Sequence, residues 1–129
     1  ASVGTAMAMS GKPEEKGAGL TNSPEPAWTA HGNKHVANGR LDWKQVVEST
    51  KTGPAKYLPN TLIEALERMV WQKGTPVTNG KTWKVMEFAN EIGASGGKSS
   101  RWIRVEESAG TIHGHPITQA EYLKLTKVR

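Results

Sequence analysis

The chain has 129 residues, 36% of them hydrophobic, and a formal net charge of +5. This length favours one domain with a modest core, and no apolar run approaches the roughly 20 residues that a membrane-spanning helix needs. The absence of cysteine excludes disulfides, cysteine-rich zinc sites and thiol nucleophiles, while the basic balance favours polyanionic partners, nucleic acids first.

Residues 1–26 contain recurrent glycine and proline and almost no apolar periodicity. Such a segment buries too little surface to offset its ordering entropy. We therefore expect residues 1–26 to be a linker or tail from a longer parent protein, and the folded domain to cover residues 27–129.

The first two histidines, His31 and His35, lie in the segment WTAHGNKHV. In a helix they would share one face, because residues four apart are neighbours on a helix surface. Gly32 disfavours a helix by about 1 kcal/mol, so a short irregular turn is an equal alternative.

Two helices are predicted in the middle of the chain. Asp42 is a candidate N-cap for the helix WKQVVESTK, which has apolar residues at helical spacing. Thr61 and Glu64 have the spacing of a capping box for a second helix, which ends near Lys73-Gly74. We assign the apolar stripes of both helices to the core.

From Thr75 onward the pattern changes to the period of two that is typical of strands. Asn79-Gly80 is a strong hairpin signal, and strands are predicted over 81–89 and 101–107. The glycine-rich stretch between these strands, residues 93–100, is predicted to be a loop.

The segment GTIHGHP, residues 110–116, is predicted to be a further strand that ends at Pro116. Its alternation places Thr111, His113 and His115 on one face. Thr118 is the expected N-cap of a short final helix. N-terminal helices, an antiparallel meander of three to four strands and a short C-terminal helix together predict an α+β domain.

The loop GASGGKSS invites comparison with a phosphate-binding loop, but the comparison fails. That motif needs a glycine five residues before Gly97, where this chain has Ile92, and it must open a helix rather than a strand. Lys98 could still contact a backbone phosphate from such a turn.

The four histidines form two close pairs, and both pairs have workable zinc-ligand spacings. The first pair lacks the glutamate of the H-E-x-x-H motif, and Lys34 would place a positive charge inside the site. A metal site is therefore an alternative rather than the favoured interpretation, and no cofactor is expected.

Cleavage of RNA by its own 2′-hydroxyl requires a base, an acid for the leaving oxygen and cations near the phosphate. Histidine suits both proton-transfer roles because its pKa of about 6.5 lies near neutrality. Lysine and arginine stabilise the charge that develops on the phosphate. The expected catalytic residues are His35 and His113 as the proton-transfer pair, surrounded by His31, Lys34, Thr111 and His115, and the expected substrate-binding residues are Lys98, Arg101 and Arg104.

Three blocks of the chain resemble the C-terminal toxin domains of bacterial polymorphic toxins. They are WTAHGNKHV, the long stretch from STKTGPAKYLPN to NEIGASGGK, and GTIHGHPITQAEYLKL. The resemblance is to the type 35 polymorphic toxin group, which contact-dependent growth inhibition proteins of the CdiA kind carry, and it covers about residues 27–128.

This resemblance implies a toxin that is delivered from the cell surface as part of a larger protein, acts in the cytoplasm of a target bacterium and is blocked by a cognate immunity protein. It also implies an RNase fold of the barnase, EndoU, colicin and RelE kind, and cleavage of RNA, in particular tRNA, without a metal. Lys34-His35 and Thr111-Ile112-His113 match the two catalytic elements of such toxins. No glutamate stands out as a barnase-like base, so histidines are expected to be the acid and the base. A metal-dependent nuclease and a non-enzymatic nucleic-acid-binding module are the alternatives.

Overall fold

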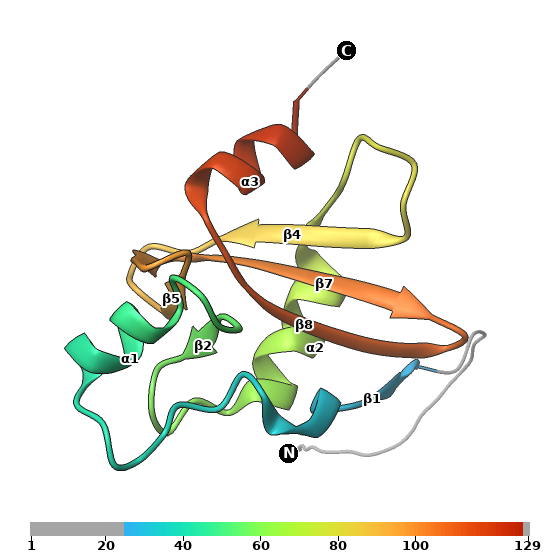
Figure 1. Ribbon diagram of the computed structural model, residues 1–129. Helices are drawn as coiled ribbons and strands as arrows, with labels where there is room; N and C mark the ends of the chain where they lie inside the picture. Colours follow the sequence, from blue (N-terminus) through green and yellow to red (C-terminus); the bar gives the residue numbers. More distant parts are fainter. Residues whose placement is uncertain (1–24, 128–129) are drawn as a thin grey trace, which may run out of the picture.

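The computed structural model describes residues 25–127 and confirms an α+β chain (Figure 1). The elements of this part are β1 (Ala27–Trp28), η1 (His31–Asn33), α1 (Trp43–Ser49), β2 (Lys56–Tyr57), α2 (Ile63–Lys73), β3 (Thr75–Pro76), β4 (Trp83–Glu87), β5 (Gly93–Ser95), β6 (Lys98–Ser100), β7 (Trp102–Ser108), β8 (Thr111–Ile117) and α3 (Gln119–Leu125). None of the helices in these residues has the length and apolar character that a membrane crossing needs. The predicted linker, residues 1–26, lies almost entirely outside the described residues.

The strands form two sheets. The larger sheet has the order β1-β8-β7-β4-β3, and the smaller one has the order β2-β5-β6. Strands β4, β7 and β8 pair antiparallel, as the predicted meander requires, but the β5–β6 hairpin is inserted between β4 and β7. The sequence did not predict β1, which pairs parallel to the outer edge of β8.

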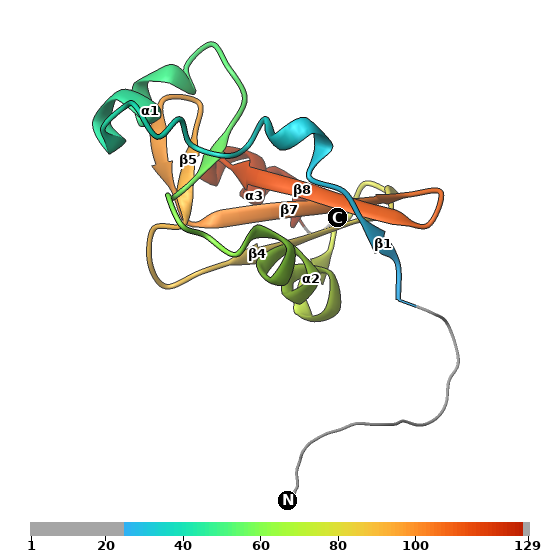
Figure 2. The same cartoon turned by 90° about the horizontal axis from the view of Figure 1, so that it is seen from below.

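The two faces of the larger sheet bury different clusters, which explains the alternation along its strands. Helix α2 packs on one face, where Val70 meets Ile103, Val105 and Ile112 (Figure 2). On the other face, side chains of α3 pack against the buried sheet residues Val85, Trp102 and Ile117 and cover one end of the sheet. The remainder of that second face carries polar side chains.

The helix ends confirm two of the three predicted caps. The Asp42 side chain accepts a hydrogen bond from the Gln45 N–H, and Thr118 caps α3 in the same way. The predicted capping box at Thr61 is wrong: its hydroxyl donates to the Leu58 carbonyl instead, and α2 starts two residues later without a side-chain cap. A local turn therefore competed successfully for the hydroxyl.

Two boundaries in the strand region also differ from the predictions. The glycine-rich stretch is a tight hairpin between β5 and β6, turning at Gly96 and Gly97, which both have positive φ. It opens no helix, in agreement with the rejection of a phosphate-binding loop. Strand β8 continues one residue past Pro116, because Pro116 lies opposite Ile103 at a position whose backbone N–H would point away from β7.

Candidate active site

Two pairs of polar side chains face each other across β7 and β8. Arg104 lies opposite His115, and Glu106 lies opposite His113. The two-residue turn between the strands, Ala109-Gly110, has positive φ at both positions and fixes this register. All four side chains are on the face of the sheet that α2 does not cover, and we call them the β7–β8 quartet.

Arg104 is the centre of the quartet. One terminal nitrogen lies 2.9 Å from the Glu121 carboxylate of α3, and the other lies 3.1 Å from Glu106 and 3.1 Å from the His115 Nε2. Its guanidinium carbon lies 4.1 Å from the centre of the Trp83 ring. These contacts hold a half-buried cation in one orientation, because the planar guanidinium satisfies several partners at once.

The hydrogen bonds of His115 determine which ring nitrogen is free to accept. Its Nδ1 lies 2.8 Å from the Pro116 carbonyl, which can only accept, so Nδ1 carries the proton. Nε2 then accepts from Arg104. Burial lowers the pKa of His115, and the positive charge of Arg104 acts in the same direction. His115 is therefore neutral at pH 7.

His35 comes from the segment after η1 and stacks on His115, with ring centroids 5.2 Å apart. The side chain is 7% exposed, and its Nδ1 lies 2.6 Å from the Ala55 carbonyl. The Nε2 atom is buried without a hydrogen-bond partner. Burial lowers the pKa of His35 to about 4 despite the hydrogen bond to Ala55.

The helical alternative for the first histidine pair is wrong, and the irregular turn is confirmed. The segment forms a single 3-10 turn, because Gly32 and Asn33 have φ of 73° and 60°, which interrupts helical geometry. The side chain of His31 lies outside the described part of the structure. The catalytic assignment of His31 therefore stays a prediction.

His113 and Glu106 form the most exposed pair of the quartet. The His113 Nε2 lies 3.6 Å from a Glu106 carboxylate oxygen, and the two side chains are 20% and 27% exposed. Glu106 is not recognisable from the sequence as a site residue, because Val105-Glu106-Glu107 resembles an ordinary solvent-facing strand. Only the pairing register, set by the turn that follows, places this carboxylate opposite a histidine.

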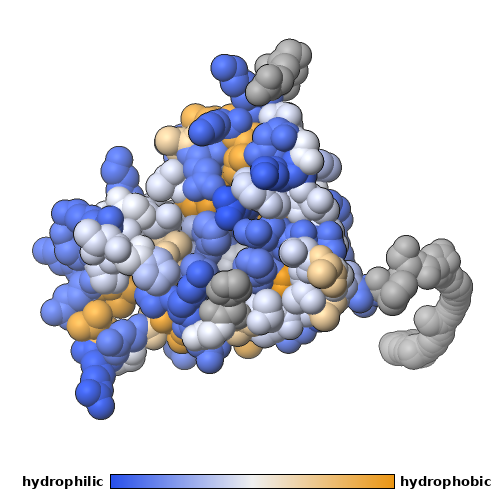
Figure 3. Space-filling model, turned by 45° about the vertical axis from the view of Figure 1, so that its right-hand side comes forward, coloured by the Kyte–Doolittle hydropathy of each residue, from blue (hydrophilic) through white to orange (hydrophobic). Residues whose placement is uncertain are grey.

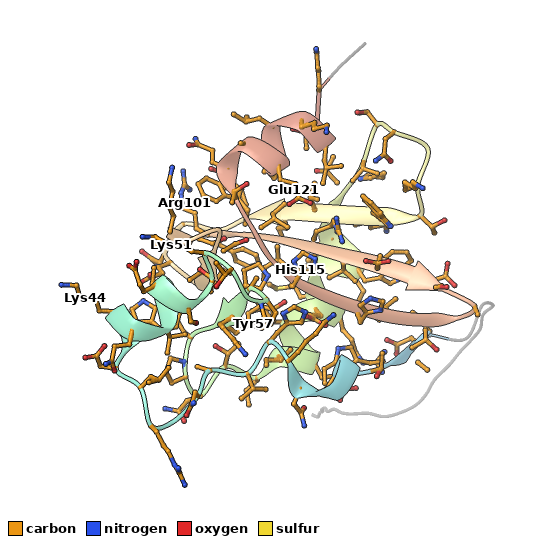
Figure 4. All side chains as sticks on the ribbon, viewed as in Figure 1. Lys44, Lys51, Tyr57, Arg101, His115 and Glu121 are labelled. Carbon is orange, nitrogen blue, oxygen red and sulfur yellow. The ribbon has the colours of Figure 1, made fainter. Side chains whose placement is uncertain are left out.

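Of the other predicted site residues, Thr111 shares the sheet face of the quartet, whereas Lys34, Lys98 and Arg101 lie outside it. Thr111 is on the same face at the turn end of β8, whereas Lys34 is exposed beside His35 and its carbonyl accepts from the Lys56 ammonium. Lys98 lines a separate pocket of about 410 Å³, and Arg101 forms an ion pair with Glu87. Figure 4 shows Arg101 away from His115, which lies between Glu121 and Tyr57.

The metal-ligand alternative gains no support from this geometry. In residues 25–127, with the side chain of His31 left aside, no group of three or more histidine, aspartate or glutamate side chains could hold a metal ion. Among the described side chains, His35 and His115 are stacked on each other rather than converging on one point.

No protein-family model, curated protein or solved structure matches the chain. The function is therefore inferred from the chemistry of the β7–β8 quartet. A carboxylate can accept a proton, and a protonated imidazole beside it can donate one. The adjacent guanidinium can stabilise an anionic transition state.

Proposed function

We propose that this protein is a metal-independent endoribonuclease that acts as a toxin between bacteria. The observation that carries the proposal is the β7–β8 quartet, which presents a carboxylate, two imidazoles and a guanidinium on one partly exposed sheet face. These are the groups that cleavage of RNA through its 2′-hydroxyl requires.

In the proposed reaction Glu106 accepts the proton of the 2′-hydroxyl, whose oxygen attacks the neighbouring phosphorus. The bond from phosphorus to the 5′-oxygen breaks, and His113 donates a proton to that oxygen. The products are a 2′,3′-cyclic phosphate and a 5′-hydroxyl. Arg104 stabilises the negative charge that gathers on the phosphate oxygens during the transfer.

His35 has a different role in this mechanism from the one expected from the sequence. A group whose pKa is about 4 binds a proton too weakly to be the general acid at neutral pH. Its contact is with His115, which in turn accepts from Arg104. We infer that His35 and His115 orient Arg104, while Glu106 takes the role of the base.

The substrate class follows from charge and from the resemblance to polymorphic toxins. A net charge of +5 attracts a polyanion, and Figure 3 shows a mainly hydrophilic face with small separate hydrophobic patches. The resemblance points to tRNA as the substrate, to a barnase-like RNase fold and to a cognate immunity protein as the partner. An acidic immunity protein that covers the quartet is the expected inhibitor.

The decisive test is cleavage of total RNA and of purified tRNA by the wild-type protein and by Glu106→Gln and His113→Asn variants. We expect each substitution to lower kcat by about 100-fold or more, because it removes one proton-transfer group. Glu64→Gln is the matched control, since Glu64 is exposed on α2 and forms a local ion pair with Arg68. Undiminished cleavage by both quartet variants would refute the mechanism.

Two further readouts separate the alternatives. Full activity in excess EDTA excludes a metal-dependent nuclease, whereas loss of activity that Mg²⁺ or Zn²⁺ restores would establish one. Intact RNA after incubation with the wild-type protein, combined with a measurable shift of labelled RNA in a gel, would identify a non-enzymatic binding module.

A further inference from the structure

Glu67 is a buried acidic side chain outside the β7–β8 quartet. It lies on α2 with 1% of its surface exposed. Its carboxylate accepts hydrogen bonds from the Tyr57 hydroxyl at 2.6 Å and from the Trp28 indole at 2.8 Å, and the backbone N–H of Gly114 faces the same carboxylate across a small shared cavity. Donors from β2, β1 and β8 thus converge on one carboxylate of α2.

Gly114 faces Glu67 where the sheet lacks a neighbouring strand. Strand β1 is two residues long and pairs with β8 only at Thr111 and Ile112. Gly114 lies opposite Val105 at a position where its N–H points away from β7, so β7 cannot accept it. The Glu67 carboxylate faces this N–H and fixes the backbone between His113 and His115.

A second connection runs from Glu67 to the segment that carries His35. The backbone N–H of Tyr57 donates to the His35 carbonyl at 2.9 Å, while its hydroxyl is bound to Glu67. A small cavity of about 40 Å³ is lined by Glu67, His35 and Gly114 among others. One buried carboxylate is therefore linked to both histidine-bearing segments.

We propose that Glu67 is a positioning residue that holds the strand between His113 and His115, and the segment of His35, in the arrangement that catalysis needs. This inference rests on the proposed ribonuclease function for its kinetic part. Its structural part concerns the Gly114 amide and the histidine rings, and its test needs no enzymatic activity.

Three substitutions separate positioning from simple stability. Glu67→Leu keeps the volume but leaves the Tyr57, Trp28 and Gly114 donors without an acceptor. Glu67→Gln keeps a carbonyl oxygen for Gly114, and its amide can donate to the Tyr57 hydroxyl, which both donates and accepts. Tyr57→Phe is the matched control, because it removes one donor and leaves the Gly114 contact intact.

Amide hydrogen exchange and the NMR signals of the histidine rings are the primary readouts. We expect Glu67→Leu to accelerate exchange at Gly114 by at least about tenfold and to shift the His35 and His115 signals, while most other amides stay unchanged. Glu67→Gln and Tyr57→Phe should keep Gly114 protected. In cleavage assays we expect Glu67→Leu to lower kcat by about 10- to 100-fold with KM nearly constant.

A protected Gly114 amide and unshifted histidine signals in Glu67→Leu would overturn the inference, whether or not the protein cleaves RNA. If Glu67→Leu does not fold, Glu67→Asp is measured in the same way, because the shorter side chain withdraws its carboxylate from Gly114. Failure of the wild-type protein to cleave any RNA would overturn the proposed function alone, since the exchange measurement still decides the role of Glu67.

Discussion

At the scale of single residues, the charge balance around Arg104 has a consequence for substrate binding. One guanidinium faces two carboxylates, Glu106 and Glu121, so these three groups carry a net charge of −1, and burial keeps the pKa of the neighbouring His115 low. A phosphate must therefore compete with a carboxylate for Arg104. Glu121 is the one that the proposed reaction does not use.

We expect Glu121→Gln to lower KM for RNA by roughly threefold at low salt, with kcat nearly unchanged, because it frees one terminal nitrogen of Arg104 and removes a repulsive charge. The measurement is steady-state cleavage of a short labelled RNA. Glu48→Gln removes the same charge from α1, where Glu48 pairs with Lys51, and should change KM much less. An equal effect of both variants would mean that only the total charge matters.

The buried histidines also make stability depend on pH. Burial lowers the pKa of His35 from 6.5 to about 4, and the charges of His115, Lys34 and Lys56 act in the same direction. The unfolded chain therefore binds a proton at a higher pH than the folded chain does. The contribution of His35 is fully present above about pH 6.5 and is lost as the pH falls toward about 4.

We expect the loss for His35 to amount to no more than about 3 kcal/mol. Urea unfolding of the wild type and of His35→Asn at pH 7.5 and at about pH 4.5 measures it. Asparagine places an N–H near the position of Nδ1, so it can keep the bond to Ala55, but it does not titrate. The free energy of unfolding of His35→Asn should therefore fall less between the two pH values than that of the wild type. Equal losses in both proteins would show that His35 is not the titrating group.

At the scale of elements, the close approach of β8 to β7 depends on a glycine between the two histidines. A Cβ built at Gly114 would collide with the Arg104 carbonyl oxygen and would lie 2.8 Å from the Val105 Cγ2 atom. Both neighbours belong to the central strand of the larger sheet, which has little freedom to move. Gly114 is thus required by packing.

Gly114→Ala should destabilise the protein by about 2 kcal/mol through overpacking and should also reduce RNA cleavage. Chemical denaturation measures the first effect and a cleavage assay the second. Gly39→Ala is the matched control, because a Cβ there would meet no atom within 4 Å, and its φ is not in the left-handed region. A Gly114→Ala protein as stable as the control would show that β8 can shift.

Among the elements, local sequence patterns account well for strand faces and for caps with nearby partners. Val85 and Met86 are adjacent in β4, and the period of two of a strand accounts for their packing in the separate clusters on the two faces of the sheet. The cap at Asp42 was predictable since all of its partners lie within one helical turn. The cap at Thr61 was not, because a local carbonyl competed for the hydroxyl.

The candidate site was only partly predictable, since its contacts join distant segments. The strand GTIHGHP and its two outward histidines followed from alternation alone. The partner Glu106 required the register of a turn, and the carboxylate of Glu67 required the packing of α2 against three strands. Neither of these residues stands in a spacing that marks a catalytic motif.

At the scale of the whole molecule, the net charge of +5 makes RNA binding sensitive to ionic strength. Binding of single-stranded RNA releases counterions, so log K falls linearly with log salt concentration, with a slope of about −0.7 for each phosphate contacted. We expect KM for RNA to rise several-fold between 50 and 200 mM NaCl while kcat stays nearly constant. A KM that does not change with salt would argue against phosphate contacts.

The parallel pairing of β1 with β8 has a consequence for the order in which the chain assembles. A ribosome releases Ala27 and Trp28 before their partners Thr111 and Ile112, which emerge more than 80 residues later, as 111 minus 27 gives 84. A contact of such long sequence separation forms late, since a large loop must close first. The edge of the sheet, next to the Trp28 bond to Glu67, is therefore completed only after Thr111 and Ile112 have been synthesised.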